Sequence, residues 1–131
     1  MTTWQGLVNY IRSRYSIFDE QPGVVRMLFS YEDGRNQLVV VSRLTLDNGE
    51  EWADISSAFG ELTSIDLNKA VRFVGEKAIC GGVACAGEVA TFRHSVPLLK
   101  LDANEFDRPL LIVAEMADEL ERELMGGADQ Y

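Results

Sequence analysis

The chain has 131 residues, of which 12 are basic and 21 acidic, so its formal net charge is −9. This length suits a single domain over residues 1–131, because two halves would each bury too little surface to fold. The acidic charge and the scattered basic residues argue against nucleic-acid binding, and no apolar run approaches the ~20 residues of a membrane helix.

The first residues lack the basic and then apolar pattern of a secretory signal. We therefore expect a cytoplasmic protein that does not contact a membrane. An acidic surface most often reports solubility, and it also suits a basic partner protein.

Residues 3–15 are predicted to form the first helix, because their apolar side chains recur at intervals of three and four residues. Thr2 or Thr3 supplies the N-terminal cap, since a hydroxyl accepts a hydrogen bond from an otherwise unpaired amide. Pro22 and Gly23 then break the chain. The apolar stripe consists of Trp4, Leu7, Val8, Ile11 and Tyr15.

Three strands are predicted next, over residues 24–31, 38–46 and 51–59. Turn residues separate them at 32–36 and at Asp47-Asn48-Gly49. The middle strand is β-branched and apolar on both sides at its centre, which is typical of a strand inside a sheet. Strands joined by such short turns form an antiparallel meander.

A second helix is predicted over residues 66–76, with Ser64 as its cap and a core face made of Leu67, Ala70, Val71 and Val74. Residues 78–85 and 88–96 then indicate a hairpin that closes at Ala86-Gly87. The segment from Cys80 to Cys85 is small and glycine-rich, so its strand length and register stay open.

The last helix gives the clearest pattern. Asp107 is its expected cap, Pro109 falls in the first turn, and Gly126 ends it. Asp118 and Arg122 form an i,i+4 pair. The core stripe is Leu110, Val113, Ala114, Ala117, Leu120 and Leu124, and the carboxylates expected to face solvent are Glu115, Asp118, Glu119, Glu121 and Glu123.

These elements predict one core that draws on both sheet and helices. Its members are Leu7, Val8, Ile11, Phe29, Val40, Ile55, Val71, Phe92, Leu110, Val113, Ala117 and Leu120.

No catalytic, cofactor-binding or metal-ligating residue emerges from the sequence, so we expect no enzyme. His94 is the only histidine and lies in a strand, which favours a packing or surface role over a catalytic one. Gly81-Gly82 lacks the lysine and the helix start of a phosphate loop. Cys80 and Cys85 lack further ligands at zinc spacing, and as small buried residues of a reduced cytoplasm they need no disulfide.

Apolar residues outside the expected core suggest a partner surface. Leu111, Ile112 and Met116 lie beside the main stripe of the last helix, and Val24 and Leu28 lie opposite the core face of the first strand. Monomers seldom leave such patches in water, and burial against a second copy is the commonest remedy. We therefore predict a symmetric homodimer. The alternative is that the protein's own sheet and first helix cover the last helix on two sides.

The order α-β-β-β-α-β-β-α resembles the type III secretion chaperone-like fold. Within that group the chain is most similar to the YbjN-like family, a family of bacterial sensory transduction regulators, with the Tir-chaperone family as a relative. The segments that carry the resemblance are residues 27–34 running into 38–41, residues 87–98, and the helix end at 117–124. The resemblance implies a twisted antiparallel sheet flanked by helices, in a small cytoplasmic homodimer that holds extended partner segments against apolar patches and sheet edges.

Three functions compete at this point. The leading hypothesis is a non-enzymatic, dimeric protein-binding module, chaperone-like or regulatory, with an unidentified protein partner. The second is a small-ligand-binding domain or enzyme that uses the concave sheet face, for which the strand-borne candidates are Arg26, Arg43, Arg93 and His94. The third is an inhibitor or immunity protein, suggested only by small size and acidity.

Overall fold

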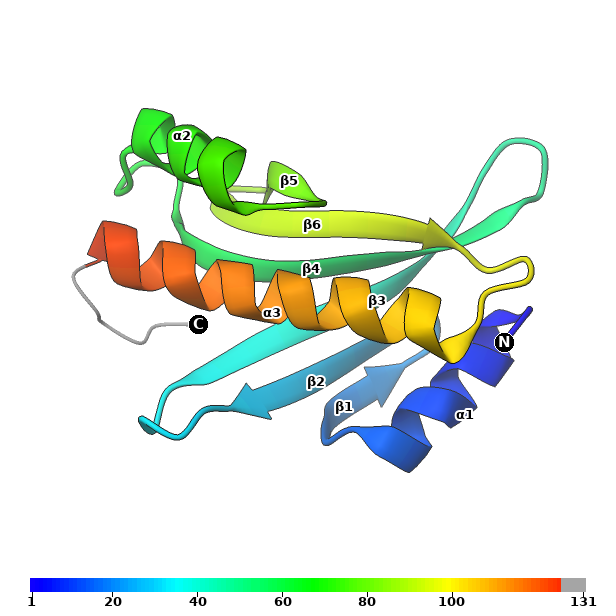
Figure 1. The fold of residues 1–131 in the computed structure, drawn as a ribbon. Coiled ribbons are helices and arrows are strands. Elements are labelled where there is room, and N and C mark those ends of the chain that lie inside the picture. Colours follow the sequence, from blue (N-terminus) through cyan, green and yellow to red (C-terminus); the bar gives the residue numbers. More distant parts are fainter. Residues whose placement is uncertain (126–131) are drawn as a thin grey trace.

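The computed structural model describes residues 1–125, and Figure 1 shows how they are arranged. The helices are α1 (Trp4–Arg14), α2 (Leu67–Lys77) and α3 (Ala103–Met125). The strands are β1 (Ile17–Gln21), β2 (Val24–Ser30), β3 (Asn36–Thr45), β4 (Glu51–Glu61), β5 (Gly82–Ala86) and β6 (Val89–Pro97). Within residues 1–125 they form one antiparallel sheet in the order β1-β2-β3-β4-β6-β5. The predicted α+β class, an antiparallel sheet flanked by helices, is confirmed.

Strand β1 is an element that the sequence pattern does not reveal. It pairs with β2 from Ile17 to Gln21, and its register shifts between Ile17 and Asp19. This irregularity interrupts the alternation that marks a strand. Asp19 instead forms an ion pair with Arg26 on the neighbouring strand, at 2.9 Å. The observed order is therefore one strand longer than the predicted one.

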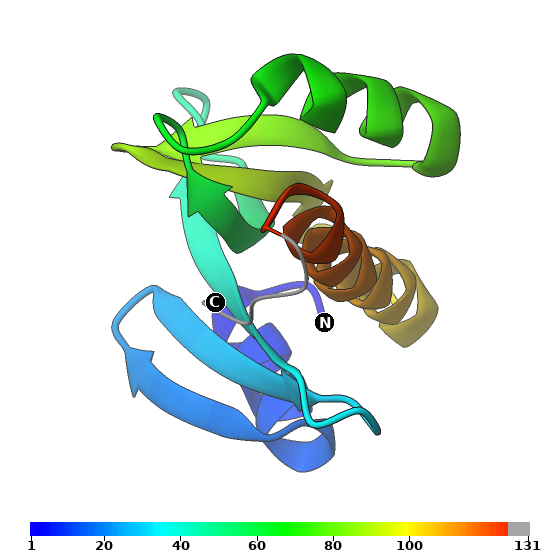
Figure 2. The ribbon, with the colours of Figure 1, turned by 90° about the vertical axis from the view of Figure 1, so that its left-hand side faces the viewer.

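The core lies between one face of the sheet and the helices α1 and α3. We call this the inner face; Figures 1 and 2 show both helices on that side, with α3 running along the middle of the sheet. Most predicted core residues are buried, among them Ile55, Phe92 and Leu120. The exceptions are Phe29 and Val40, which are only partly buried, and Val71, which is exposed.

The fifth strand begins at Gly82 and not at residue 78, which corrects the predicted hairpin. Gly81 precedes it with a φ of +83°, and a Cβ atom there would come within 2.6 Å of the Phe92 ring. Only glycine suits a site with that backbone conformation and that close contact. Cys80 therefore lies in the loop, and Cys85 lies on the strand.

Three of the helix caps can be compared with the predictions. Thr3 caps α1, as expected, by accepting a hydrogen bond from the Gly6 amide. Asp66, and not Ser64, caps α2. Helix α3 starts before Asp107: the side chains of Asp102 and Glu105 accept hydrogen bonds from each other's amides, which is a capping box. Pro109 consequently lies inside the helix. Gly126, the predicted helix end, lies outside the described residues.

Asp107 has a different role from the predicted one, because it joins α1 to α3. Its carboxylate accepts hydrogen bonds from the hydroxyls of Tyr10 and Tyr15. Burial, followed by the bond to this carboxylate, raises the pKa of both tyrosines. They therefore stay protonated as donors at neutral pH.

A buried ion-pair cluster fixes the β2–β3 turn to α3. The Arg35 guanidinium donates hydrogen bonds to the carboxylates of Asp118 and Glu121, each at 2.8 Å. All three side chains are at most 10% exposed. The prediction that Asp118 and Glu121 face solvent was therefore wrong. The predicted pair of Asp118 with Arg122 is confirmed, at 3.4 Å.

We expect Phe92→Ala and Leu120→Ala each to lower the free energy of unfolding by about 2–5 kcal/mol, because both side chains are fully buried. Leu46→Ala is the matched control on an exposed apolar residue, and its effect should stay within about 0.5 kcal/mol. Urea denaturation measures all three. An unchanged midpoint for Phe92→Ala would mean that the buried face of β6 is misassigned.

We expect Arg35→Met to lower the free energy of unfolding by about 3–5 kcal/mol, because it removes the buried guanidinium that both Asp118 and Glu121 bind. Arg93→Met removes a more exposed pair with Asp54 and should cost at most about 1 kcal/mol. Arg35→Lys keeps the charge and should recover part of the loss. Equal losses for Arg35→Met and Arg93→Met in urea denaturation would contradict a structural role for the buried cluster.

Candidate protein-binding surfaces

Helix α2 leaves an apolar flank in water. Of the predicted core face, Ala70 is fully buried and Val74 is partly buried against the core, whereas Leu67 is 45% and Val71 55% exposed, so the prediction was wrong for these last two residues. At 100° per residue, Leu67 and Val71 lie on one flank, and Phe73 and Lys77 lie on the other. Phe73 and Lys77 line a hollow with α3, so the flank with Leu67 and Val71 is turned away from α3. We call Leu67 and Val71 the α2 stripe.

Strand β5 offers an open sheet edge next to α2. It is the last strand of the sheet on its side, and it contacts α2. Its sequence, Gly-Val-Ala-Cys-Ala, carries no charge and no proline. The opposite edge strand, β1, has a register shift and two acidic residues, Asp19 and Glu20. Charges and irregular register protect an edge from pairing with another chain, and β5 has neither feature.

The sheet face away from α1 and α3, which we call the outer face, carries two of the predicted partner residues. Val24 and Leu28 lie there on β2, where Val24 is partly buried and Leu28 is 37% exposed. Leu28 pairs across the strands with Leu38. Figure 2 shows no described helix over this face. The outer face is therefore a mixed surface of apolar pairs and polar side chains.

The other three predicted partner residues lie far from Val24 and Leu28, on α3. Leu111 is 44% exposed, Ile112 is partly buried, and Met116 is buried within the protein. Ile112 and Met116 line a hollow together with Ile79, which is 87% exposed. The structure thus divides the five residues between two surfaces and brings Ile79 into the second.

The cationic residues considered for a ligand site do not converge. Arg26 pairs with Asp19, Arg43 with Glu51 at 3.6 Å, and Arg93 with Asp54 at 2.8 Å. His94 lies on the other face of β6 from Arg93. A shared anion site would need several of these charges free on one face, and that arrangement is not present among the described residues.

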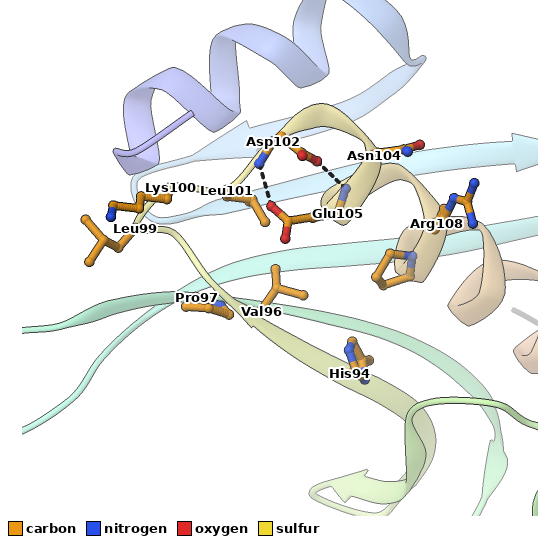
Figure 3. Close-up of a pocket in the computed structure, with 11 residues that line it drawn as sticks. His94, Val96, Pro97, Leu99, Lys100, Leu101, Asp102, Asn104, Glu105 and Arg108 are labelled. Atoms are coloured by element: carbon orange, nitrogen blue, oxygen red, sulfur yellow. Dashed lines mark hydrogen bonds between the residues drawn. The ribbon is translucent and has the colours of Figure 1, made fainter.

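A cavity of about 690 Å³ lies between the end of β6 and the first turns of α3 (Figure 3). Its walls mix apolar and ionisable side chains, and Figure 3 shows Glu105 and Val96 among the residues that line it. The capping box already engages Glu105 and Asp102. Because α3 covers the concave sheet face, the cavity lies at the end of that face. The lining residues include His94, Val96, Pro97, Leu99, Leu101 and Arg108.

Both cysteines are free thiols in the described structure. Burial raises the pKa of the Cys80 thiol, so it is a weaker nucleophile and metal ligand at neutral pH. Within residues 1–125 no group of three or more histidine, cysteine or acidic side chains is arranged to hold a metal ion. In the same part of the chain, no helix is both long and apolar enough to cross a membrane.

In fold class, this antiparallel sheet with the long helix α3 on its inner face is similar to the type III secretion chaperones. Comparison with solved structures supports this class. The chain matches a chain in the structure of the HopA1–SchA chaperone–effector complex with a TM-score of 0.60 and 13% identity, over 87% of this chain and 88% of that one. No protein-family profile matches the sequence. No curated protein matches it either.

Sequence reasoning missed the exposure of the α2 stripe and the open β5 edge. A signal for the edge existed, because residues 82–86 are small, uncharged and close to a helix end. The α2 stripe gave no such signal, because the sequence pattern of an apolar stripe is the same whether the stripe packs against its own chain or against another one.

We expect neither a chelator nor a reductant to lower the melting temperature, because neither thiol is bound to another group in the described structure. The double variant Cys80→Ala/Cys85→Ala should change stability only modestly, since cysteine packs as a small apolar residue. Thermal unfolding followed by circular dichroism measures both effects. Stoichiometric zinc in purified protein would overturn this expectation.

Proposed function

We propose that this protein is a non-enzymatic protein-binding module, chaperone-like or regulatory, that acts as a homodimer in the bacterial cytoplasm. Its fold is that of a chain in a chaperone–effector complex. The YbjN-like resemblance of residues 27–41 and 87–98 supports a regulatory variant of that role. Holding a partner in this way requires no catalytic group.

The observation that carries the proposal is the α2 stripe beside the open β5 edge. Leu67 and Val71 are about half exposed on a helix that contacts an uncharged edge strand. A twofold axis near this corner would bury both stripes and could pair the two edges. Burial of such surface is favourable by about 25 cal/mol per Å² of apolar area.

Two further surfaces remain for partner segments in such a dimer. The outer face with Val24 and Leu28 presents apolar pairs between strands. The α3 surface has a hollow that Ile112 and Met116 line together with Ile79, and Leu111 is exposed on the same helix. Their separation suits a partner that contacts the dimer at several places.

The cavity next to His94 favours a second candidate function, the binding of a small ligand. Mixed apolar and polar walls are typical of ligand pockets. A screen of small molecules by thermal shift tests this candidate. A compound that raised the melting temperature of the native protein but not of a His94→Ala variant would favour it.

We expect sedimentation equilibrium at micromolar concentration to give twice the chain mass of 14.6 kDa. The double variant Leu67→Glu/Val71→Glu should sediment as a monomer, because it places four charges of one sign in the paired stripes. The control variant Leu46→Glu/Leu99→Glu adds the same charge at two other exposed leucines and should remain dimeric.

A native protein that sediments as a clean 14.6 kDa species would contradict the dimer. If the native protein and Leu67→Glu/Val71→Glu both sediment as dimers, the homodimer is supported, but its location at the α2 stripe is contradicted. Far-UV circular dichroism of each variant separates loss of association from loss of folding.

A further inference from the structure

The outward side of α3 carries a ridge with a hollow on each side. Leu111, Glu115 and Glu119 follow each other at four-residue intervals, so they form one ridge along the helix. One hollow beside this ridge is lined by Ile79, Ile112 and Met116 together with both glutamates. The second hollow, on the other side of the same two glutamates, is lined by the β2–β3 turn. We call the ridge and its two hollows the α3 trough.

The trough is apolar at one side and acidic along its middle and its other side. Ile79, on the apolar side, is 87% exposed. Glu115 and Glu119 line both hollows, and Glu32 and Asp33 project from the β2–β3 turn. Glu32, Glu115 and Glu119 form no ion pair with any residue that the structure describes.

The basic residues at the trough do not neutralise these acids. Arg122 is engaged by Asp118, which leaves Lys77 at the edge of the apolar hollow. Tyr31 lines the second hollow together with these acids. Burial, followed by the charges of Asp118 and Glu115, raises the pKa of its hydroxyl to about 12. The potential in the trough is therefore negative, and it attracts cations.

Both the charge and the walls restrict what the trough binds. A second copy of this chain would bring acidic ridge against acidic ridge, which like-charge repulsion disfavours. The walls are two helices and a turn, and the open β5 edge does not line either hollow. A segment lying there finds no unpaired strand to bond with, and a helix satisfies its own backbone groups while it presents one face to the hollows.

We propose that the α3 trough binds a basic amphipathic helix of a partner protein, with an apolar residue seated between Ile79 and Ile112 and lysines or arginines against Glu115 and Glu119. This inference rests on the proposed protein-binding function and names the chemistry of its partner. It uses a surface separate from the α2 stripe, so binding at the trough and dimerisation are measured independently.

The test uses a fluorescent model peptide of about 18 residues, or five helical turns, made of leucine and lysine with one apolar and one basic face. Fluorescence anisotropy should show saturable binding to the full chain that weakens as salt is raised. A peptide with glutamate in place of lysine should not bind. A lysine–leucine peptide of the same composition in scrambled order should bind at least about tenfold more weakly, because it presents no apolar face.

Variants of the protein test whether the peptide binds at the α3 trough. Glu115→Lys/Glu119→Lys should weaken binding of the basic amphipathic peptide by about tenfold or more. Asp47→Lys/Glu88→Lys changes the net charge equally at two exposed acids elsewhere and should have a much smaller effect. Ile79→Ser should weaken binding at unchanged charge. If the lysine variant fails to fold, Glu115→Gln/Glu119→Gln takes its place.

Equal affinity for the two charge variants, or equal binding of the ordered and scrambled peptides, would overturn the inference. So would the absence of any saturable binding. In each case, sedimentation of the same native protein shows whether it is a dimer. A lack of peptide binding at the trough is therefore distinguishable from failure of the proposed function.

Discussion

The inner face of the sheet holds α1 and α3, and this arrangement leaves α2 at the margin of the core, which it joins through Ala70. Helix α3 buries residues from Phe106 to Leu120 against the sheet, and the ion pairs of Arg35 with Asp118 and Glu121 fix its C-terminal half to the β2–β3 turn. A domain of this size has room for one such layer. Helix α2 therefore lies at the margin, against β5 and the side of α3, with Leu67 and Val71 in water. The proposed surfaces follow from this one constraint.

Periodicity was sufficient to predict most of the fold. The stripes of α1 and α3 and the alternation in β2, β4 and β6 depend on local burial, which repeats along the chain. Strand β1 was missed because its register shift breaks that alternation beside Asp19 and Glu20. The caps of α2 and α3 were displaced because several acidic or hydroxyl residues stand near each helix start, and only the backbone geometry chooses among them. Asp107 is the clearest case, since its partners Tyr10 and Tyr15 are distant in sequence.

The candidate surfaces were predicted less well, for a different reason. The surplus of apolar residues on α3 was visible in the sequence, but Met116 is buried within the chain, and Val24 and Leu28 lie on another face. An amphipathic pattern indicates that one face of a helix is apolar, but it does not indicate which part of the protein, or which partner, packs against that face. In the same way, Asp118 and Glu121 were predicted to face solvent because their partner, Arg35, lies more than 80 positions earlier in the chain. Pairings of this kind depend on topology, which local patterns do not encode.

We propose that a second copy of the chain covers the corner formed by α2 and β5. Amide hydrogen exchange tests this claim at the level of single elements, with the edge strand β1 as an internal reference. We expect the amides on the open edge of Gly82–Ala86 to be protected in the native protein and to lose protection in Leu67→Glu/Val71→Glu, while those of Ile17–Gln21 exchange equally in both. Equal exchange of the β5 amides in the two proteins would contradict it.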